Sequence, residues 1–235
     1  MPAKPSFQTT NRILSRLSES DFGLVEPQLS AVDLPMRKQL EISRRPIEHV
    51  YFPDSGIISV VASSDNNRSI EVGLIGREGM TGLAIVMGTD RSTHQTFVQS
   101  AGRGWRIKSD GLRDAIAKSA TLHKRFLQYG HAFLLQTGYT AMANGRSKIE
   151  DRLARWLLMA HDRVDGDTLS LTHEFISVML GVRRPGVTHA LNLLERTGLI
   201  QAGRGTITII DREGLEESSN GAYGAPEAEF NRIFG

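Results

Sequence analysis

The sequence of 235 residues predicts an α+β protein in which an antiparallel β-roll precedes a long helix and a small domain of helices and a β-hairpin. Three observations predict this order. Short apolar runs separated by turns fill the first half, the hydrophobic period becomes helical after Asp110, and two short helical segments around Gly181 precede an alternating run. The predicted boundaries are 1–118 for the roll, 119–145 for the long helix and hinge, 146–217 for the small domain and 218–235 for a flexible tail.

Composition excludes several classes of protein. Hydrophobic residues make up 40% and charged residues 23%, which is close to globular averages and excludes global disorder. The absence of cysteine excludes disulfides, thiolate nucleophiles and cysteine-ligated metal centres. Apolar runs are too short to span a bilayer, so we expect no membrane partner and a cytoplasmic location. A net charge of +2 does not by itself indicate a nucleic-acid partner.

The β-roll is predicted by apolar runs that recur every 8 to 12 residues or so, as in sandwiches and barrels. The runs lie at residues 47–52, 57–62, 70–75, 83–87, 96–99 and 105–107. The preceding segment, 11–40, combines helical spacing with Pro27 and Pro35. It is therefore expected to form short helices that pack onto the roll.

A single long helix is predicted by Leu122, Phe126, Tyr129 and Phe133, which recur at steps of three and four. The pair Asn144-Gly145 is expected to end it.

A second apolar stripe on this helix has heptad spacing. It consists of Leu127, Leu134 and Ala141, and the nearby Gly130 and Gly138 would let an identical helix approach closely. Such residues can also simply cover the roll. Two stripes are more than one contact needs, however, and this favours a dimer seam and hence a homodimer.

The small domain begins with a further amphipathic helix, 149–160, and continues with two helical segments, 172–180 and 184–194. Gly181 permits the positive φ of a tight turn between them. Pro185 suits the first turn of the second segment, where its missing N–H has no intrahelical partner. This order is typical of a helix-turn-helix.

The outer face of the second helix presents Arg184, Thr188 and His189. An alternating run at 206–210 follows, and the turn before it carries Arg204, so the sequence predicts a hairpin that serves as the wing of a winged helix-turn-helix. Similar helix pairs occur in proteins that bind no DNA. A sensory or scaffolding module that acts through protein contacts therefore stays open as an alternative.

Four stretches, residues 170–176, 180–184, 191–200 and 203–211, resemble the DNA-binding domain of the Crp/Fnr transcription regulators, the cyclic-AMP receptor protein family. The order of roll, long helix, hinge and winged helix-turn-helix resembles that family over most of the chain. The resemblance implies a roll of the cyclic-nucleotide-binding jelly-roll type. It also implies a sequence-specific regulator that binds double-stranded DNA as a homodimer on a pseudo-palindromic site, with RNA polymerase as a further partner.

The same resemblance assigns roles to single positions. Arg184 matches the arginine that reads guanine in the major groove, and His189 falls where many relatives have a second base-reading arginine. Pro185 replaces a glutamate common in the family, which implies a different operator. Four further residues match phosphate contacts of the family: Thr172, Arg183, Gly186 and Arg204.

The cyclic-nucleotide cassette is only partly matched. Gly82, Arg91 and Ser92 fall at cassette positions, and Thr137 falls where relatives contact the base, but the glutamate that holds the ribose hydroxyl is missing. The loss of this charge-assisted hydrogen bond would lower affinity for cyclic AMP by about ten- to a hundredfold. We therefore expect control by something other than cyclic AMP and no resident cofactor.

Enzymatic activity is not expected. The chain has no Gly-x-Ser-x-Gly elbow and no phosphate-binding loop, and His173-Glu174 lacks the second histidine of a zinc protease helix. Each of four histidines could ligate haem iron: His49, His94, His123 and His131. Scattered histidines are usually surface or core residues, however, so neither haem nor another metal is predicted.

Overall fold

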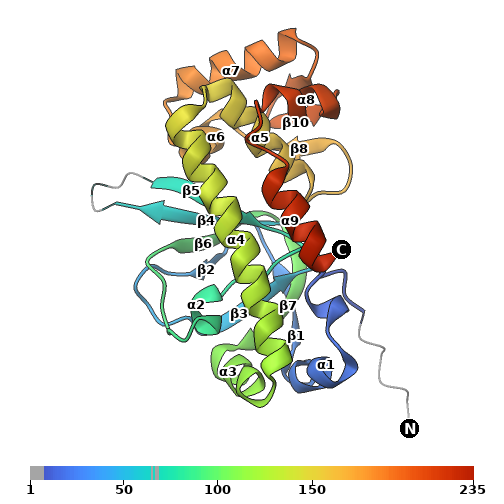
Figure 1. Cartoon of the computed structure of the whole chain (residues 1–235). Coiled ribbons are helices and arrows are strands. Elements are labelled where there is room, and N and C mark those ends of the chain that lie inside the picture. Colours follow the sequence, from blue (N-terminus) through green and yellow to red (C-terminus); the bar gives the residue numbers. More distant parts are fainter. Residues whose placement is uncertain (1–7, 65, 67–68) are drawn as a thin grey trace.

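A computed structural model describes residues 8–64, 66 and 69–235. The chain forms a β-roll, a long helix that runs along it, and a small domain at one end of that helix (Figure 1). No helix among the described residues is long and apolar enough to cross a membrane.

The roll consists of two antiparallel sheets. One sheet has the order β1-β7-β3 and the other the order β2-β6-β4-β5. Phe52 from the first sheet and Phe126 from the long helix meet in the core of the roll, with ring centroids 6.1 Å apart. The strands are β1 (Ser30–Leu34), β2 (Gln39–Glu41), β3 (His49–Pro53), β4 (Ile57–Ser63), β5 (Ser69–Ile75), β6 (Gln95–Ser100) and β7 (Gly102–Lys108).

Two predictions about the roll are wrong. The segment 11–40 holds the expected short helices η1 (Leu14–Arg16), α1 (Glu19–Val25) and η2 (Glu26–Gln28), but it continues into β1 and β2. Strand β1 pairs with β7 more than sixty residues later, and no local pattern reveals such a partner. The run 83–87 forms the short helix α2 (Leu83–Val86) instead of a strand, because Gly82 turns the chain with a φ of 72°.

Helix α3 (Ser109–Lys118) leads into the long helix α4 (Ala120–Arg146). The predicted stripe is buried at Leu122, Phe126 and Tyr129, which pack on the roll. The prediction that Asn144-Gly145 ends this helix is wrong, because α4 continues to Arg146. Its C-terminus is fixed by the extended Ser147, whose N–H bonds to the Ala143 carbonyl.

The small domain packs directly against the roll. Its core is continuous with Ile57, Val61 and Leu74 of β4 and β5, so the two parts share one hydrophobic cluster. Its elements are α5 (Ile149–His161), β8 (Thr168–Ser170), α6 (His173–Leu180), α7 (Arg184–Arg196), β9 (Ile200–Gly203), β10 (Thr206–Ile209) and α8 (Arg212–Ser218).

The tail at 218–235 is ordered, contrary to the expectation of flexibility. It contains helix α9 (Ala225–Phe234), which lies beside α4 (Figure 1). Pro226 occupies its first turn, and Phe230 and Phe234, one helical turn apart, are buried with stacked rings. The glycine- and glutamate-rich composition masked this short apolar stripe.

Candidate nucleic-acid interface

Helices α6 and α7 are joined by a tight turn. The Thr172 hydroxyl caps α6 by accepting the N–H of Phe175 at 3.2 Å. Gly181 ends α6 in the left-handed conformation with a φ of 62°, and a Cβ there would lie 3.0 Å from Ile70 of β5. A glycine is therefore needed both for the turn and for the close approach to the roll.

Helix α7 separates a buried face from a polar one. Val187, Ala190, Leu191 and Leu194 are at most 2% exposed. Arg183, Arg184 and His189 lie on the exposed side. Packing thus fixes which residues α7 can present to a partner.

The cations of this surface are free to contact a partner. Within the described part of the chain, Arg183, Arg184 and Arg204 form no ion pair or side-chain hydrogen bond. Interior arginines differ, since Arg163 is ion-paired with Glu78 at 2.7 Å. An exposed arginine without an anion nearby suits a ligand that supplies phosphates and base edges.

Two predicted contact residues also have internal roles. The Thr188 hydroxyl bonds to the carbonyl of Arg184 at 3.3 Å and lies 3.2 Å from the His173 ring, so it is partly engaged already. Gly186 lies where α7 crosses α5, and a Cβ there would come within 3.1 Å of Ile149. A side chain at this position would require Ile149 to shift by a few tenths of an ångström.

The predicted hairpin is formed by β9 and β10, with Arg204-Gly205 as its two-residue turn. Gly205 has a φ of 76°, which the turn requires. The Glu195 carboxylate of α7 accepts the N–H of Ala202 in β9 at 2.9 Å. This bond ties the hairpin to α7 and fixes the exposed Arg204 relative to that helix.

The predicted nucleotide cassette is occupied by a side chain of the protein itself. The N–H of Gly82 donates to the Glu41 carboxylate at 2.6 Å, and the Thr96 hydroxyl donates to its other oxygen at 3.1 Å. Glu41 is 7% exposed, and burial raises its pKa. The cavity beside it holds only about 70 Å³. Sequence reasoning missed Glu41 because it lies forty-one residues from Gly82.

The four predicted ligand residues do not converge. Gly82 and Ser92 line this small cavity. Arg91 is exposed and pairs with the neighbouring Asp90 at 3.0 Å, and the Thr137 hydroxyl bonds to the carbonyl of Phe133 within α4 at 3.0 Å.

Comparison with known proteins agrees with this geometry. A family profile described as a Crp-like helix-turn-helix domain matches residues 151–218. A search of the curated proteins finds no match.

Several solved structures have a similar fold. A Crp/Fnr family transcriptional regulator from Eubacterium rectale is 19% identical, with a TM-score of 0.71 over 88% of this chain and 97% of that one. FixK2 from Bradyrhizobium japonicum is 16% identical, with a TM-score of 0.70 over 80% and 96%. The c-di-GMP-responsive regulator CLP from Xanthomonas campestris is 18% identical, with a TM-score of 0.65 over 82% and 99%. At these identities the similarity shows the fold.

Proposed function

Because the chain carries a Crp-like helix-turn-helix domain on the fold of the Crp/Fnr regulators, we propose that it is a sequence-specific DNA-binding transcription regulator. It acts as a homodimer on a pseudo-palindromic site. The observation that carries the proposal is the free guanidinium of Arg184 at the start of α7, flanked by Arg183 and by Arg204 of the hairpin. Arg184 reads a guanine, His189 contacts a second base, and the phosphate contacts come from Thr172, Arg183, Gly186 and Arg204.

The partners follow from this role. They are duplex DNA, a second copy of the chain and RNA polymerase, and they imply a cytoplasmic protein that is not an enzyme. The alternative is a scaffolding protein whose helix-turn-helix no longer binds DNA. Such a protein would not need unpaired arginines on α7 and the hairpin. The exposure of all three arginines favours the DNA reader.

The homodimer is supported by an apolar surface along α4. Leu127, Leu134 and Met142 are 42%, 66% and 45% exposed, and nothing lies within 4 Å of a Cβ placed on Gly138. Gly130 is not part of this surface, because a Cβ there would meet Met87 at 3.3 Å. An exposed apolar stripe on a long helix is typical of an interface.

Replacing Leu134 with aspartate is expected to convert the dimer to a folded monomer. Two symmetric copies of Leu134 would each lose about 1.5–3 kcal/mol of burial, which weakens dimerisation by about a hundredfold or more. Sedimentation velocity measures the change, and the affinity for a selected duplex should fall with it.

Met36→Asp is the matched control, because Met36 is 52% exposed on the roll, outside α4. This variant should sediment like the wild type. If the Leu134→Asp protein stays dimeric and keeps its affinity for the duplex, α4 does not form the dimer interface.

Cyclic AMP is expected to bind weakly or not at all. The Glu41 carboxylate already accepts the Gly82 N–H, and a buried carboxylate repels a cyclic phosphate. Calorimetric titration with cyclic AMP should give no saturable heat, for the wild type and for Arg91→Ala alike. Micromolar binding of one nucleotide per chain, abolished by Arg91→Ala, would contradict the account.

A further inference from the structure

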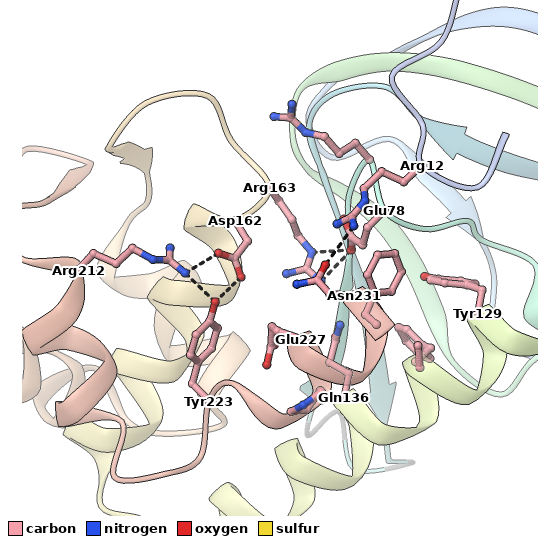
Figure 2. A pocket seen from close by; sticks show the side chains of 15 residues that line it. Arg12, Glu78, Tyr129, Gln136, Asp162, Arg163, Arg212, Tyr223, Glu227 and Asn231 are labelled. Carbon is pink, nitrogen blue, oxygen red and sulfur yellow. Dashed lines mark hydrogen bonds and ion pairs between the residues drawn. The ribbon is translucent and has the colours of Figure 1, made fainter. Parts of the chain in front are cut away.

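A cavity of about 350 Å³ lies where the roll, α4 and the small domain meet (Figure 2). Its walls come from the segment before η1, the loop after β5, α4, the turn after α5, α8, the α8–α9 connection and α9. Among the described residues, Phe133 alone lines both this cavity and the small Gly82 cavity. A volume of this size is typical of sites for small molecules.

Among the described residues, four arginines and three carboxylates line the cavity, and each of these carboxylates already has a donor. Two of the arginines also pair with carboxylates outside the lining, Arg77 with Asp165 at 2.6 Å and Arg212 with Glu216 at 3.0 Å. Glu78 pairs with Arg163 at 2.7 Å, Asp162 pairs with Arg212 at 2.8 Å, and Glu227 accepts the N–H of Gly224 at 3.0 Å.

Arg12 is the lining arginine whose charge is least compensated. Its guanidinium donates to the amide oxygen of Asn231 at 3.0 Å and lies 4.7 Å from the centre of the Phe230 ring. It forms no ion pair with a described carboxylate. Partial burial is the main cause that lowers its pKa, the nearby Arg16 adds to this effect, and the Glu78 carboxylate opposes it.

Tyr129 supplies a second unused donor. Its side chain points from α4 toward the Glu78–Arg163 pair (Figure 2), and the residue is 3% exposed. The hydroxyl lies against the backbone of Gly79 and Met80, and its proton has no acceptor among the described residues. A buried donor without an acceptor is less favourable than a satisfied one, and this favours a ligand that accepts its proton.

The rest of the lining is mixed, with three polar residues (Gln136, Tyr223 and Asn231) beside four apolar ones. The apolar residues are Ala132 and Phe133 of α4 and Pro226 and Phe230 of α9, two helices that pack against each other. From these contacts we propose that the cavity binds a small organic anion whose carboxylate or phosphate contacts Arg12 and Tyr129 while its flat apolar body packs on Phe133. The lining residues come both from the roll, as at Glu78, and from the small domain, as at Arg163 and Arg212, so the bound anion lies between the two parts. The inference that the anion regulates DNA binding rests on the proposed function. The inference that the anion binds in the cavity does not.

The test uses 2-naphthoate, 2-naphthyl phosphate and the neutral 2-naphthamide as probes, titrated into the full chain by calorimetry. We expect one anion per chain with a Kd of about 1 mM or tighter. The amide should bind about tenfold more weakly or not at all. The better of the two anions identifies the headgroup.

Variants locate the site. Arg12→Gln should weaken the anion about tenfold or more, and Tyr129→Phe about threefold to tenfold. Arg113→Gln is the matched control, because Arg113 lies on α3 with Asp110 as its ion-pair partner and should leave binding unchanged. Failure of both anions to saturate, or binding that ignores Arg12→Gln, overturns the proposal.

The same preparations are tested for binding to a selected DNA duplex. Duplex binding without anion binding would reject the cavity site and leave the proposed function standing. Anion binding without duplex binding would support the cavity site and reject the proposed function.

Discussion

Arg184→Ala is expected to lower the affinity of the dimer for its selected operator by about 30-fold or more and to leave the fold intact. A bidentate arginine–guanine pair contributes about 1–3 kcal/mol of discrimination, and a two-fold symmetric dimer makes the contact twice. Arg184 is exposed and forms no ion pair, so its removal disturbs no internal contact that the structure describes. Fluorescence anisotropy with the labelled operator measures the loss.

The variant should also lose selectivity at one base position in each half-site. Arg196→Ala is the matched control, because Arg196 is exposed in the last turn of the same helix. Its affinity should stay close to that of the wild type. If the wild type and Arg184→Ala bind the operator with equal affinity, α7 does not read bases, and the scaffolding alternative is favoured.

Glu71→Gln is expected to stabilise the protein at neutral and alkaline pH. Glu71 lies on β5, 4% exposed, and accepts the indole N–H of Trp156 of α5 at 2.5 Å. Its other carboxylate oxygen has no partner among the described residues. Burial raises the pKa of Glu71 to about 7, because it disfavours the charged form.

The raised pKa fixes the direction of the pH dependence. Between the ordinary value of 4.5 and about 7, the folded chain binds more protons at this site than the unfolded chain does. Its contribution to the free energy of unfolding is therefore complete at low pH and decreases as pH rises through this range. Above about pH 7 the loss reaches about 3 kcal/mol.

Glutamine resembles the protonated acid and keeps an acceptor for Trp156. The variant should therefore exceed the wild type by up to about 3 kcal/mol at pH 8 and match it near pH 4.5, as measured by urea unfolding. Glu48→Gln, on the exposed side of the roll, should show no such pH-dependent difference. A constant difference across the whole range would mean that Glu71 does not titrate in the folded protein.

The parts predicted correctly from sequence are those whose signals are local. The spacing of Leu122, Phe126 and Tyr129 alone reveals the buried face of α4. Gly181 marks the end of α6, and Pro185 marks the start of α7. An amphipathic helix shows its period within a few turns, whatever it packs against.

The parts that sequence reasoning missed depend on distant partners. Strand β1 exists because β7 pairs with it, and α9 is held by α4 and by the core of the roll. Glu41 fills the cassette only because the fold brings Gly82 to it, and Glu71 meets Trp156 across eighty-five residues. Buried polar contacts of this kind leave no periodic trace in the chain.

The central claim is that α7 and the hairpin read DNA in a two-fold symmetric protein. Selection of bound duplexes from a random pool by the purified, ligand-free protein tests it most directly, with a parallel selection in cyclic AMP. We expect a pseudo-palindrome in both selections, with half-sites about 10 base pairs apart and a guanine that Arg184 reads. Weak, salt-sensitive binding without any enriched sequence in either selection would contradict it.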